Sequence, residues 1–590
     1  MTEPLLPADL DWTADEAPRS RTFGDVYFSA EGGLDETRAV FLAGCGLPDA
    51  WVGRDCFVLA ETGFGTGLNI MAALDLWRRT RKPEARLRVF SVEAHPLLRE
   101  DARRAHAAWP EMAEISAALL EQWPAPTPGF HRIDLPQWGA TIDLGHGEAA
   151  EMLAAWQGRA DAWFLDGFAP ALNPKMWREE VLNLVAARSA PGARLASFTV
   201  AGGVRRGLAA AGFSVEKKPG YGRKRERLEA TRPGSPALAR KPEVLIIGAG
   251  VAGAALARAF SQLGCPATVV EAISPGAAAS GAPAALVTPR LDAGLGPVAD
   301  LGAQAFQRAV ALYRETAGAV LARGVLRLAR DDRDAGRLAR IADQPLWPPE
   351  ALDPLGPADA SDRLGEPTDR AGLWMADALT VEPAVVLETW LSGSTVRRAE
   401  VIEVEAGVRP AVRLADGGRL EADAVVLAAG WASVALGAAG LKPVRGQLAW
   451  FDGPPPTPAV WGAGYAVPTR SGVLVGATHD RGRTDTVPDA GDQAQLLDRL
   501  TQVRPGLARG LDPRTGRSRA AVRAATPDHL PLCGPLADGL WCLTGLGGRG
   551  FAWAPLLAEH LAATVVGAPS PLPGPLVDLV HPMRPSASGS

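Results

Sequence analysis

The chain has 590 residues, of which 47% are hydrophobic and 22% charged, so it is long enough for two or more domains with separate cores. Its formal net charge of -5 gives no overall attraction for nucleic acid. The five cysteines form no CxxC pair, which indicates neither a zinc site nor a disulfide framework and predicts a reduced, cytoplasmic protein without a metal. Neither a secretory signal nor a membrane-spanning run is found, so no membrane association is expected.

Strand-like apolar runs alternate with helical stretches, which predicts an α/β fold built from two units. The first alternation ends before a stretch rich in Pro, Gly and basic residues, and a second one begins directly after it. We therefore expect a Rossmann-like domain at residues 1–232, a linker at 233–242 and a second Rossmann domain at 243–567. The Pro-, Ser- and Gly-rich residues 568–590 are expected to form a flexible tail.

The segment FVLAETGFGTGLNI predicts a strand, a glycine-rich turn and a helix that begins near Leu68. Such a turn lets the backbone approach a cofactor at the helix N-terminus. A dinucleotide could bind there, but an acidic residue opens the turn and another ends the next strand, where it can accept from ribose hydroxyls. This form favours S-adenosylmethionine (SAM), a methyl donor. The expected contacts are Glu61, Gly63, Gly65, Gly67 and Glu93.

Two further acidic residues are expected at strand ends of the same sheet, where ligands bind in open α/β folds. Asp143 would reach the adenine side of the cofactor, although an ordinary turn or helix-cap carboxylate is an equal interpretation. Asp166, in DAWFLDGFAP, would orient an acceptor amine or take its proton. Phe168 and Pro170 follow in the same loop as substrate contacts, the former by stacking on a base.

A basic stretch runs from Val204 to Arg227. By composition it is either a solvated surface or a nucleic-acid contact. The residues within it that we expect to contact substrate are Arg223, Lys224 and Arg225.

The segment EVLIIGAGVAGAALARAF carries GxGxxG between a strand and a helix, and an acidic residue closes the following strand. All elements of a dinucleotide fingerprint are therefore present. Two later segments, residues 422–433 and 539–562, read as returns of the chain to the same domain, and this distribution resembles the glycine and D-amino-acid oxidase family of flavoproteins. The cofactor implied is FAD. Its expected contacts are Gly248, Gly250, Gly253, Glu271, Gly545, Gly547 and Gly548.

The sequence between these returns predicts an inserted α+β substrate domain at about residues 313–398 and 443–514, mostly antiparallel sheet. Arginine binds carboxylate bidentately, so we expect an arginine near the flavin to bind a substrate carboxylate. The candidates are Arg290, Arg445 and Arg549. We favour Arg549 as a catalytic-site residue because the last glycine-rich turn would place it beside the flavin.

ETGFGTGLN, DGFAP with NPKMW, PGYGRKRE and a C-terminal flavin domain occur in this order along nearly the whole chain. The combination resembles the MnmC family of bifunctional tRNA wobble-uridine modification proteins. The resemblance implies FAD-dependent removal of the carboxymethyl group from 5-carboxymethylaminomethyl-uridine at position 34, with release of glyoxylate. It further implies SAM-dependent methylation of the resulting amine. The implied partner is the tRNA anticodon loop, with PGYGRKRE near phosphate.

Two other functions fit parts of the pattern. A small-molecule amine or amino-acid oxidase fused to a small-molecule N-methyltransferase would need no basic patch. A tRNA-binding scaffold that keeps a degenerate flavin fold would need neither cofactor. Salt-sensitive tRNA binding argues against the former, and retained flavin argues against the latter.

Overall fold

The structure is a computed structural model that describes residues 5–29, 32–222, 224–235, 241–462, 464–512, 514 and 516–585. The chain divides into two compact units. The first contains Met1–Arg240 and Gly567–Gly574, and the second contains Lys241–Val566 and Pro575–Ser590. The division falls inside the predicted linker, of which residues 236–240 lie outside the described part.

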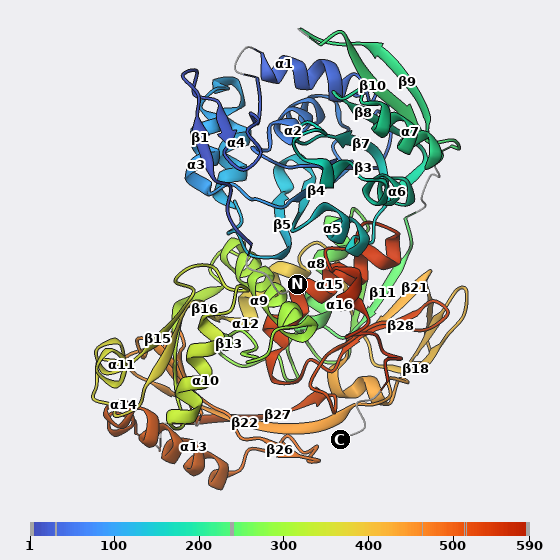
Figure 1. Cartoon of the computed structure of the whole chain (residues 1–590). Helices are drawn as coiled ribbons and strands as arrows, with labels where there is room; N and C mark the ends of the chain where they lie inside the picture. Colours follow the sequence, from blue (N-terminus) through green and yellow to red (C-terminus); the bar gives the residue numbers. More distant parts are fainter. Residues whose placement is uncertain are drawn as a thin grey trace. The chain divides into compact units, whose positions relative to one another are not determined.

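In the described residues of the first unit, eight strands form one sheet in the order β5-β6-β4-β3-β7-β8-β10-β9 (Figure 1). The central strands β6, β4, β3, β7 and β8 are parallel, and the others are antiparallel. Their bounds are β3 Cys56–Thr62, β4 Arg86–Glu93, β5 Gly129–Leu135, β6 Ala140–His146, β7 Ala160–Leu165, β8 Ser189–Ser197, β9 Ser214–Pro219 and β10 Glu226–Thr231.

Strand β3 is buried on both faces because helices cover the sheet on both sides. Its alternate residues Phe57 and Leu59 pack into one core, and Val58 and Ala60 into the other. The helices are α1 Gly33–Thr37, α2 Leu68–Thr80, α3 Arg99–His106, α4 Ala113–Glu121, α5 Ala149–Ala155, α6 Glu179–Ala187 and α7 Gly202–Ala210, with the short turns η1 Arg38–Leu42, η2 Pro110–Met112, η3 Pro136–Trp138 and η4 Pro174–Trp177. A two-stranded ribbon, β1 Leu10–Trp12 with β2 Pro18–Ser20, precedes them.

Strand β3 is the switch point of this sheet. The chain leaves β3 to form β4 on one side and later returns to form β7 on the other. Ligands bind at the carboxyl ends of strands where such an order reverses. The glycine-rich turn after β3 and the Asp166 loop after β7 both lie at this edge.

The second unit contains a six-stranded sheet in its described residues, ordered β17-β12-β11-β21-β29-β28 and parallel except for β28. The strands are β11 Val244–Ile247, β12 Thr268–Glu271, β17 Thr395–Arg398, β21 Ala424–Leu427, β28 Leu532–Ala537 and β29 Leu540–Thr544. Helices α8 Val251–Gln262 and α15 Gly550–Val566 pack on it, α12 Pro383–Leu391 packs on α8, and α9 Pro297–Glu315 packs on α15. The segments at 422–433 and 539–562 do contribute strands to this sheet, as their sequences predict.

The other large sheet of this unit, with ten described strands, follows the order β13-β16-β14-β23-β24-β25-β22-β26, with β15 on β16 and β27 on β22. The strands are β13 Ala285–Val287, β14 Val320–Leu328, β15 Leu352–Leu355, β16 Gly372–Val381, β22 Lys442–Asp452, β23 Ala459–Trp461, β24 Tyr465–Pro468, β25 Gly472–Gly476, β26 Asp480–Arg481 and β27 Arg517–Ala525. The helices at this sheet are α10 Asp332–Ala342, α11 Pro357–Leu364, α13 Ala490–Val503 and α14 Pro505–Arg509.

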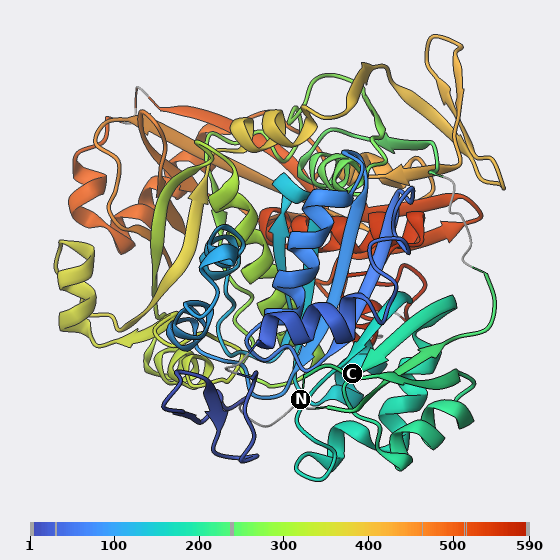
Figure 2. The same cartoon turned by 90° about the horizontal axis from the view of Figure 1, so that it is seen from above.

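Pairing in this sheet is antiparallel apart from β14 with β23. It includes strands outside the predicted insert, whereas Thr395–Arg398, placed in the insert by sequence, pairs with the six-stranded sheet. A small sheet of β18 Val401–Glu405, β19 Ala411–Leu414 and β20 Arg419–Glu421 lies apart from it (Figure 2).

The described part of the predicted flexible tail is packed, which corrects that prediction for residues 568–585. Ser570, Leu572 and Val580 are buried, and α16 spans Gly574–Val577. Arg584 forms an ion pair with Asp528 at 2.8 Å. Proline limits the conformations of the unfolded segment and so lowers the entropy lost when it packs. None of the helices in the described residues has the length and apolar character that a membrane span requires.

Candidate functional site

The turn after β3 has the backbone that close approach of a ligand requires. Gly63, Gly65 and Gly67 have φ angles of 81°, 53° and 78°, in the left-handed region that favours glycine. A Cβ at Gly63 would stand 3.3 Å from the carbonyl oxygen of Asp166. Because α2 begins at the next residue, Leu68, its unpaired first amides lie at this edge and suit the carboxylate of a bound amino-acid moiety.

Two acidic side chains stabilise the turn by hydrogen bonds. Glu61 is fully buried, and its carboxyl oxygens accept hydrogen bonds from Asn69 Nδ2 at 3.0 Å and Ser91 Oγ at 2.7 Å. Burial raises the pKa of Glu61 well above its usual range. Glu93 ends β4 and accepts from the amides of Gly65 and His95, both at 2.8 Å. Each Glu93 oxygen keeps a lone pair, so ribose hydroxyls fit there as well.

Asp143 lies elsewhere than the sequence predicts. It is in the middle of β6, which continues to His146, and it pairs with Phe90 of β4 in register. Arg132 binds both of its oxygens at 2.7 Å, and the two side chains are largely buried. A structural ion pair therefore replaces the predicted adenine contact, and the carboxyl end of β6 is formed by His146 and Gly147.

Asp166 directly follows β7 and sits at the cofactor edge of the sheet. One carboxyl oxygen accepts from the amide of Gly167 at 2.8 Å and the other from Asn69 Nδ2 at 2.7 Å. Thr62 Oγ1 donates to the Asp166 carbonyl at 2.8 Å, which ties the loop to the end of β3. Desolvation raises the pKa of Asp166 to about 6, despite these donors. A carboxylate with this pKa can accept a proton near neutral pH.

Residues from the N-terminal segment complete this site and were missed by sequence reasoning. The Phe168 ring lies 4.9 Å from that of Phe23 and 5.0 Å from that of Tyr27. Asp25 accepts from the Ala169 amide at 3.2 Å, so the segment is bonded to the Asp166 loop. Pro170 is half-buried in the same loop. The contacts join residues about 140 positions apart, and no local motif marks them.

The basic stretch forms the hairpin of β9 and β10 with the end of α7. Four of its basic residues have acidic partners: Lys217 with Glu226, Lys218 with Glu216, Arg227 with Glu229, and Lys224 with Glu36. Arg206 and Arg225 are exposed and make no ion pair within the described residues. Arg223 lies outside the described residues. Local neutralisation therefore leaves fewer unpaired cations for phosphate than composition indicates, and Lys224, a predicted substrate contact, is paired with Glu36.

The GxGxxG turn of the second unit has the packing that its motif requires. A Cβ at Gly253 would stand 1.8 Å from the Gly248 carbonyl oxygen, and Gly248 has a φ angle of 102°. Glu271 ends β12 and accepts from the Ala249 amide at 2.8 Å, leaving lone pairs for a ribose. Ser280, from the loop that follows β12, accepts from the amide of Val251 at 3.0 Å, and a Cβ at Gly250 would approach it at 3.2 Å.

The second glycine-rich turn, between β29 and α15, leaves open space. Gly545 and Gly547 have φ angles of 71° and 57°, and no heavy atom of the described residues lies within 4 Å of a Cβ at Gly547 or Gly548. Arg549 follows, in η7 Gly547–Arg549. Its buried Nε has no hydrogen-bond partner among the described residues. An unsatisfied buried guanidinium nitrogen is costly, so the site suits an anionic ligand group.

Two other arginines lie near Arg549. Desolvation and the positive charges of Arg290 and Arg327 lower the pKa of Arg549. Arg290 pairs with Asp292 at 2.8 Å, and the guanidinium carbons of Arg327 and Arg549 lie 4.8 Å and 5.8 Å from the Trp461 ring. Arg327 pairs with Asp334 at 3.0 Å, so both neighbours of Arg549 have acidic partners, and the unsatisfied Arg549 Nε is the group that suits an anionic ligand.

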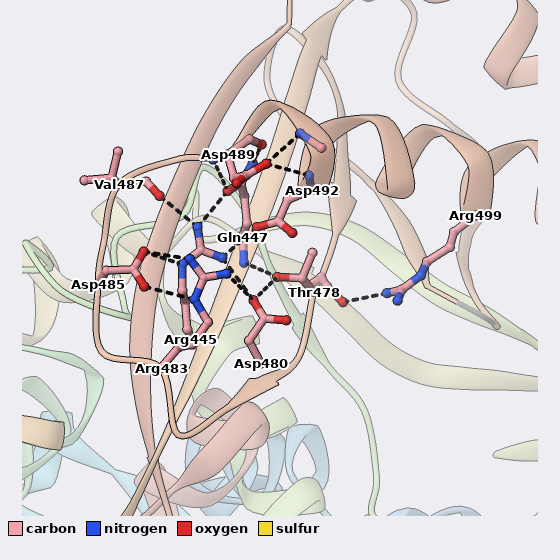
Figure 3. Close-up of polar contacts among 12 residues, drawn as sticks. Arg445, Gln447, Thr478, Asp480, Arg483, Asp485, Val487, Asp489, Asp492 and Arg499 are labelled. Carbon is pink, nitrogen blue, oxygen red and sulfur yellow. Dashed lines mark hydrogen bonds and ion pairs between the residues drawn. The ribbon is translucent and has the colours of Figure 1, made fainter.

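Arg445 is not part of this site, which corrects the third arginine prediction. Its side chain is 0% exposed, and all five N–H groups donate within the protein (Figure 3). The acceptors are Asp480, Asp485, Asp492, the amide oxygen of Gln447 and the carbonyl oxygen of Val487. No donor remains for a substrate carboxylate. Arg445 instead fastens residues 480–492 to β22.

Arg523 and Tyr465 are site candidates that the sequence did not single out. The Arg523 side chain has no hydrogen-bond or ion-pair partner among the described residues, and its Nη2 would stand 2.0 Å from a Cβ at Gly446. Tyr465 lies over Gly476, and its pKa, raised by burial, is lowered in part by the Arg523 charge. Two residues after Arg523, Ala525 pairs with Leu546, next to η7. An isolated arginine in a strand carries no sequence signal.

Comparisons with known proteins agree with this geometry. Residues 243–564 match the family model "FAD dependent oxidoreductase", and residues 110–233 match "S-adenosyl-L-methionine-dependent methyltransferase". The α/β fold class and both cofactors predicted from sequence are thereby confirmed. The second unit also shares its fold with L-proline dehydrogenase from P. horikoshii, at a TM-score of 0.51 and 18% identity over 59% of this chain and 98% of that chain.

Two relatives extend the similarity to the whole chain. A protein of Caulobacter sp. (strain K31) is 53% identical, covering 99% of this chain and 98% of the relative. Another, from Caulobacter vibrioides, is also 53% identical, covering 98% of each. Both are named "tRNA 5-methylaminomethyl-2-thiouridine biosynthesis bifunctional protein MnmC".

Proposed function

The chain belongs to the MnmC family of bifunctional proteins, and we propose that it modifies the wobble uridine, U34, of tRNA in two steps. The second unit removes the carboxymethyl group from 5-carboxymethylaminomethyl(-2-thio)uridine to give the 5-aminomethyl nucleoside. The first unit then methylates this amine. The observation that carries the proposal is that one chain holds both an acid beside a methyl-donor turn and an unsatisfied arginine beside a flavin turn.

When bound, FAD supplies a two-electron acceptor for oxidation of the C–N bond, and SAM supplies the methyl group. In the second unit, Arg549 and Arg290 hold the carboxylate of the glycine-like substituent. This contact would place the adjacent CH₂ group toward the turn at Gly547. Loss of hydride from this carbon gives an imine of glyoxylate, and water releases glyoxylate and leaves the primary amine on the nucleoside.

In the first unit, Asp166 accepts the proton that the amine must lose. A free alkylamine has a pKa of about 10, so at neutral pH its lone pair is blocked by a proton. Asn69 and the Gly167 amide fix both Asp166 oxygens, so the carboxylate is oriented before the amine arrives. Phe168, with Phe23 and Tyr27 around it, offers an aromatic surface for the uracil ring.

Exposed Arg206 on α7 and exposed Arg225 in the β9–β10 hairpin are phosphate contacts that the basic stretch still offers. Such contacts add affinity without reading sequence, so recognition of the modified nucleoside falls to the two active sites. The protein would act in the cytoplasm, where its tRNA substrates are found.

The test is mass spectrometry of nucleosides from tRNA carrying 5-carboxymethylaminomethyl-uridine, after incubation with the purified, flavin-containing chain. We expect the aminomethyl nucleoside without SAM and the methylaminomethyl nucleoside with it. An unchanged nucleoside, together with turnover of free sarcosine or glycine, would replace the proposal with a small-molecule oxidase fused to a methyltransferase.

A further inference from the structure

Lys224, at the tip of the β9–β10 hairpin, contacts two parts of the first unit that border the methyl-acceptor site. Its Nζ donates to Glu36 Oε1 at 2.6 Å and lies 4.2 Å from the centroid of the Phe198 ring. Glu36 is on α1, and Figure 1 shows the green hairpin running toward that blue helix. The ion pair and the cation–π contact together fix the hairpin tip against α1.

A chain of hydrogen bonds leads from this contact to Asp166. Thr37, the residue after Glu36, is buried, and its Oγ1 donates to Asn69 Oδ1 at 2.8 Å. Because the amide oxygen of Asn69 is held by Thr37, the amide nitrogen must face the two acids. It donates to Glu61 at 3.0 Å and to Asp166 at 2.7 Å. The position of α1 therefore sets the orientation of Asn69.

We propose that Lys224 is a positioning residue for methyl transfer, which holds α1 against the hairpin tip and so keeps Asn69 and Asp166 aligned for the acceptor amine. The inference rests on the proposed function of the first unit. It also assigns different roles to different residues of the hairpin tip. Tyr221, 39% exposed, and Arg225, with no ion pair in the described residues, are available to contact RNA, whereas Lys224 is committed to the protein.

Charge gives Lys224 a second effect that a merely structural residue would lack. The charged groups that act on Asp166 are Lys224, Glu36 and the neighbouring Glu61. Lys224 lowers the pKa of Asp166, and Glu36 raises it. Removing the lysine also leaves the Glu36 charge uncompensated, so both changes raise the pKa of Asp166. The acidic limb of the methyl-transfer rate profile should then move to higher pH.

The test compares full-length K224M and K224R with the control K217M. Lys217 is matched because it lies on the same hairpin and pairs with Glu226 at 2.7 Å, and within the part of the chain that the structure describes it makes no polar contact with the acceptor site. With aminomethyl-tRNA as substrate, we expect K224M to lower kcat on the order of tenfold to a hundredfold, as misplacement of a catalytic group does. Its acidic limb should move to higher pH. K224R should recover most of the rate, and K217M should match wild type.

Hydrogen exchange gives a readout that does not depend on methyl transfer. Amides of residues 33–37 should exchange faster in K224M than in wild type or K217M, because α1 has lost its contact with the hairpin. Equal exchange in all variants would overturn the positioning role, as would a K224M effect confined to the KM for tRNA, which indicates a phosphate contact instead. Wild-type protein that cannot methylate aminomethyl-tRNA would refute the proposed function, while the exchange result would still decide whether Lys224 holds α1.

Discussion

At the scale of residues, Asp166 shows how a fold can place a base at the pKa its task requires. Desolvation raises the pKa of the side chain, whereas two hydrogen-bond donors and the Lys224 charge lower it. The balance leaves a pKa of about 6. A lower value would give a weaker base, and a higher one would leave it protonated.

Asp166→Asn should abolish most methyl transfer, by roughly 10²- to 10⁴-fold, because the amide cannot accept the amine proton. In wild type, the rate of this step should fall as pH drops below about 6, where Asp166 becomes protonated. Single-turnover methyl transfer measured across pH checks both points. Anaerobic flavin reduction by the carboxymethylaminomethyl substrate is the control and should be unchanged; loss of both activities would make Asp166 a structural residue.

Arg549→Lys should lower kcat/KM for the oxidation step by about 1.5–3 kcal/mol, or roughly one to two powers of ten, because an ammonium group cannot bind a carboxylate bidentately. Stopped-flow flavin reduction at several substrate concentrations measures the change. Arg470→Lys is a suitable control, since Arg470 is exposed and pairs with Glu382. If Arg549→Lys behaved like this control, the substrate carboxylate would have to bind elsewhere, for instance at Arg523.

Residue placement could be predicted where a local pattern fixes it. Asp166 follows an apolar strand and Glu93 is the last residue of another, so both lie at one edge of the sheet. The predicted adenine contact of Asp143 was wrong because the strand continues for three more residues, and the sequence carries no signal of where β6 ends. Tyr27 and Arg523 could not be found, since their neighbours are distant in sequence.

At the scale of elements, the glycine-rich turns after β3 and after β11 depend on close packing of the backbone. Gly253→Ala should prevent FAD retention, because the added Cβ would stand 1.8 Å from the Gly248 carbonyl oxygen and push α8 from β11. The flavin absorbance per mole of purified protein measures this. Gly336→Ala in α10 is the matched control: its Cβ meets nothing within 4 Å, and alanine favours a helix, so flavin content should be normal. A yellow Gly253→Ala protein would mean that the turn can shift without losing the cofactor.

Arg445→Met should loosen residues 480–492 without altering the carboxylate site. The substitution leaves three carboxylates facing a buried methionine, and breaking a buried ion pair typically costs about 3–5 kcal/mol. We expect faster hydrogen exchange in β22 and α13, with the KM of the oxidation step nearly unchanged. A large rise in this KM with normal exchange would return Arg445 to the substrate site.

The elements themselves followed from apolar alternation and glycine placement, but the limits of the insert did not. Thr395–Arg398 reads as an ordinary strand, and only its pairing with β12 assigns it to the cofactor sheet. Likewise, Ala285–Val287 is too short for its sequence to predict that it pairs with the larger sheet. Pairing between distant segments is a tertiary property that local propensity does not encode.

At the scale of the whole molecule, each unit has its own core, so each active site should work when the other is disabled. A mixture of full-length Asp166→Asn and Arg549→Met proteins should therefore form the methylaminomethyl nucleoside, with the intermediate tRNA passing between molecules. Mass spectrometry of the nucleosides measures this, with each variant alone as the control. Accumulation of only the aminomethyl nucleoside in the mixture would mean that the intermediate tRNA does not pass from one protein molecule to the other.

The assignment of Gly567–Gly574 to the first unit has a consequence for biosynthesis. The ribosome makes this segment only after residues 241–566 of the second unit, yet Leu572 within it is fully buried. The methyltransferase therefore cannot reach its final packing until most of the oxidase has been translated. A gene cut at the linker would yield a first half that permanently lacks this piece.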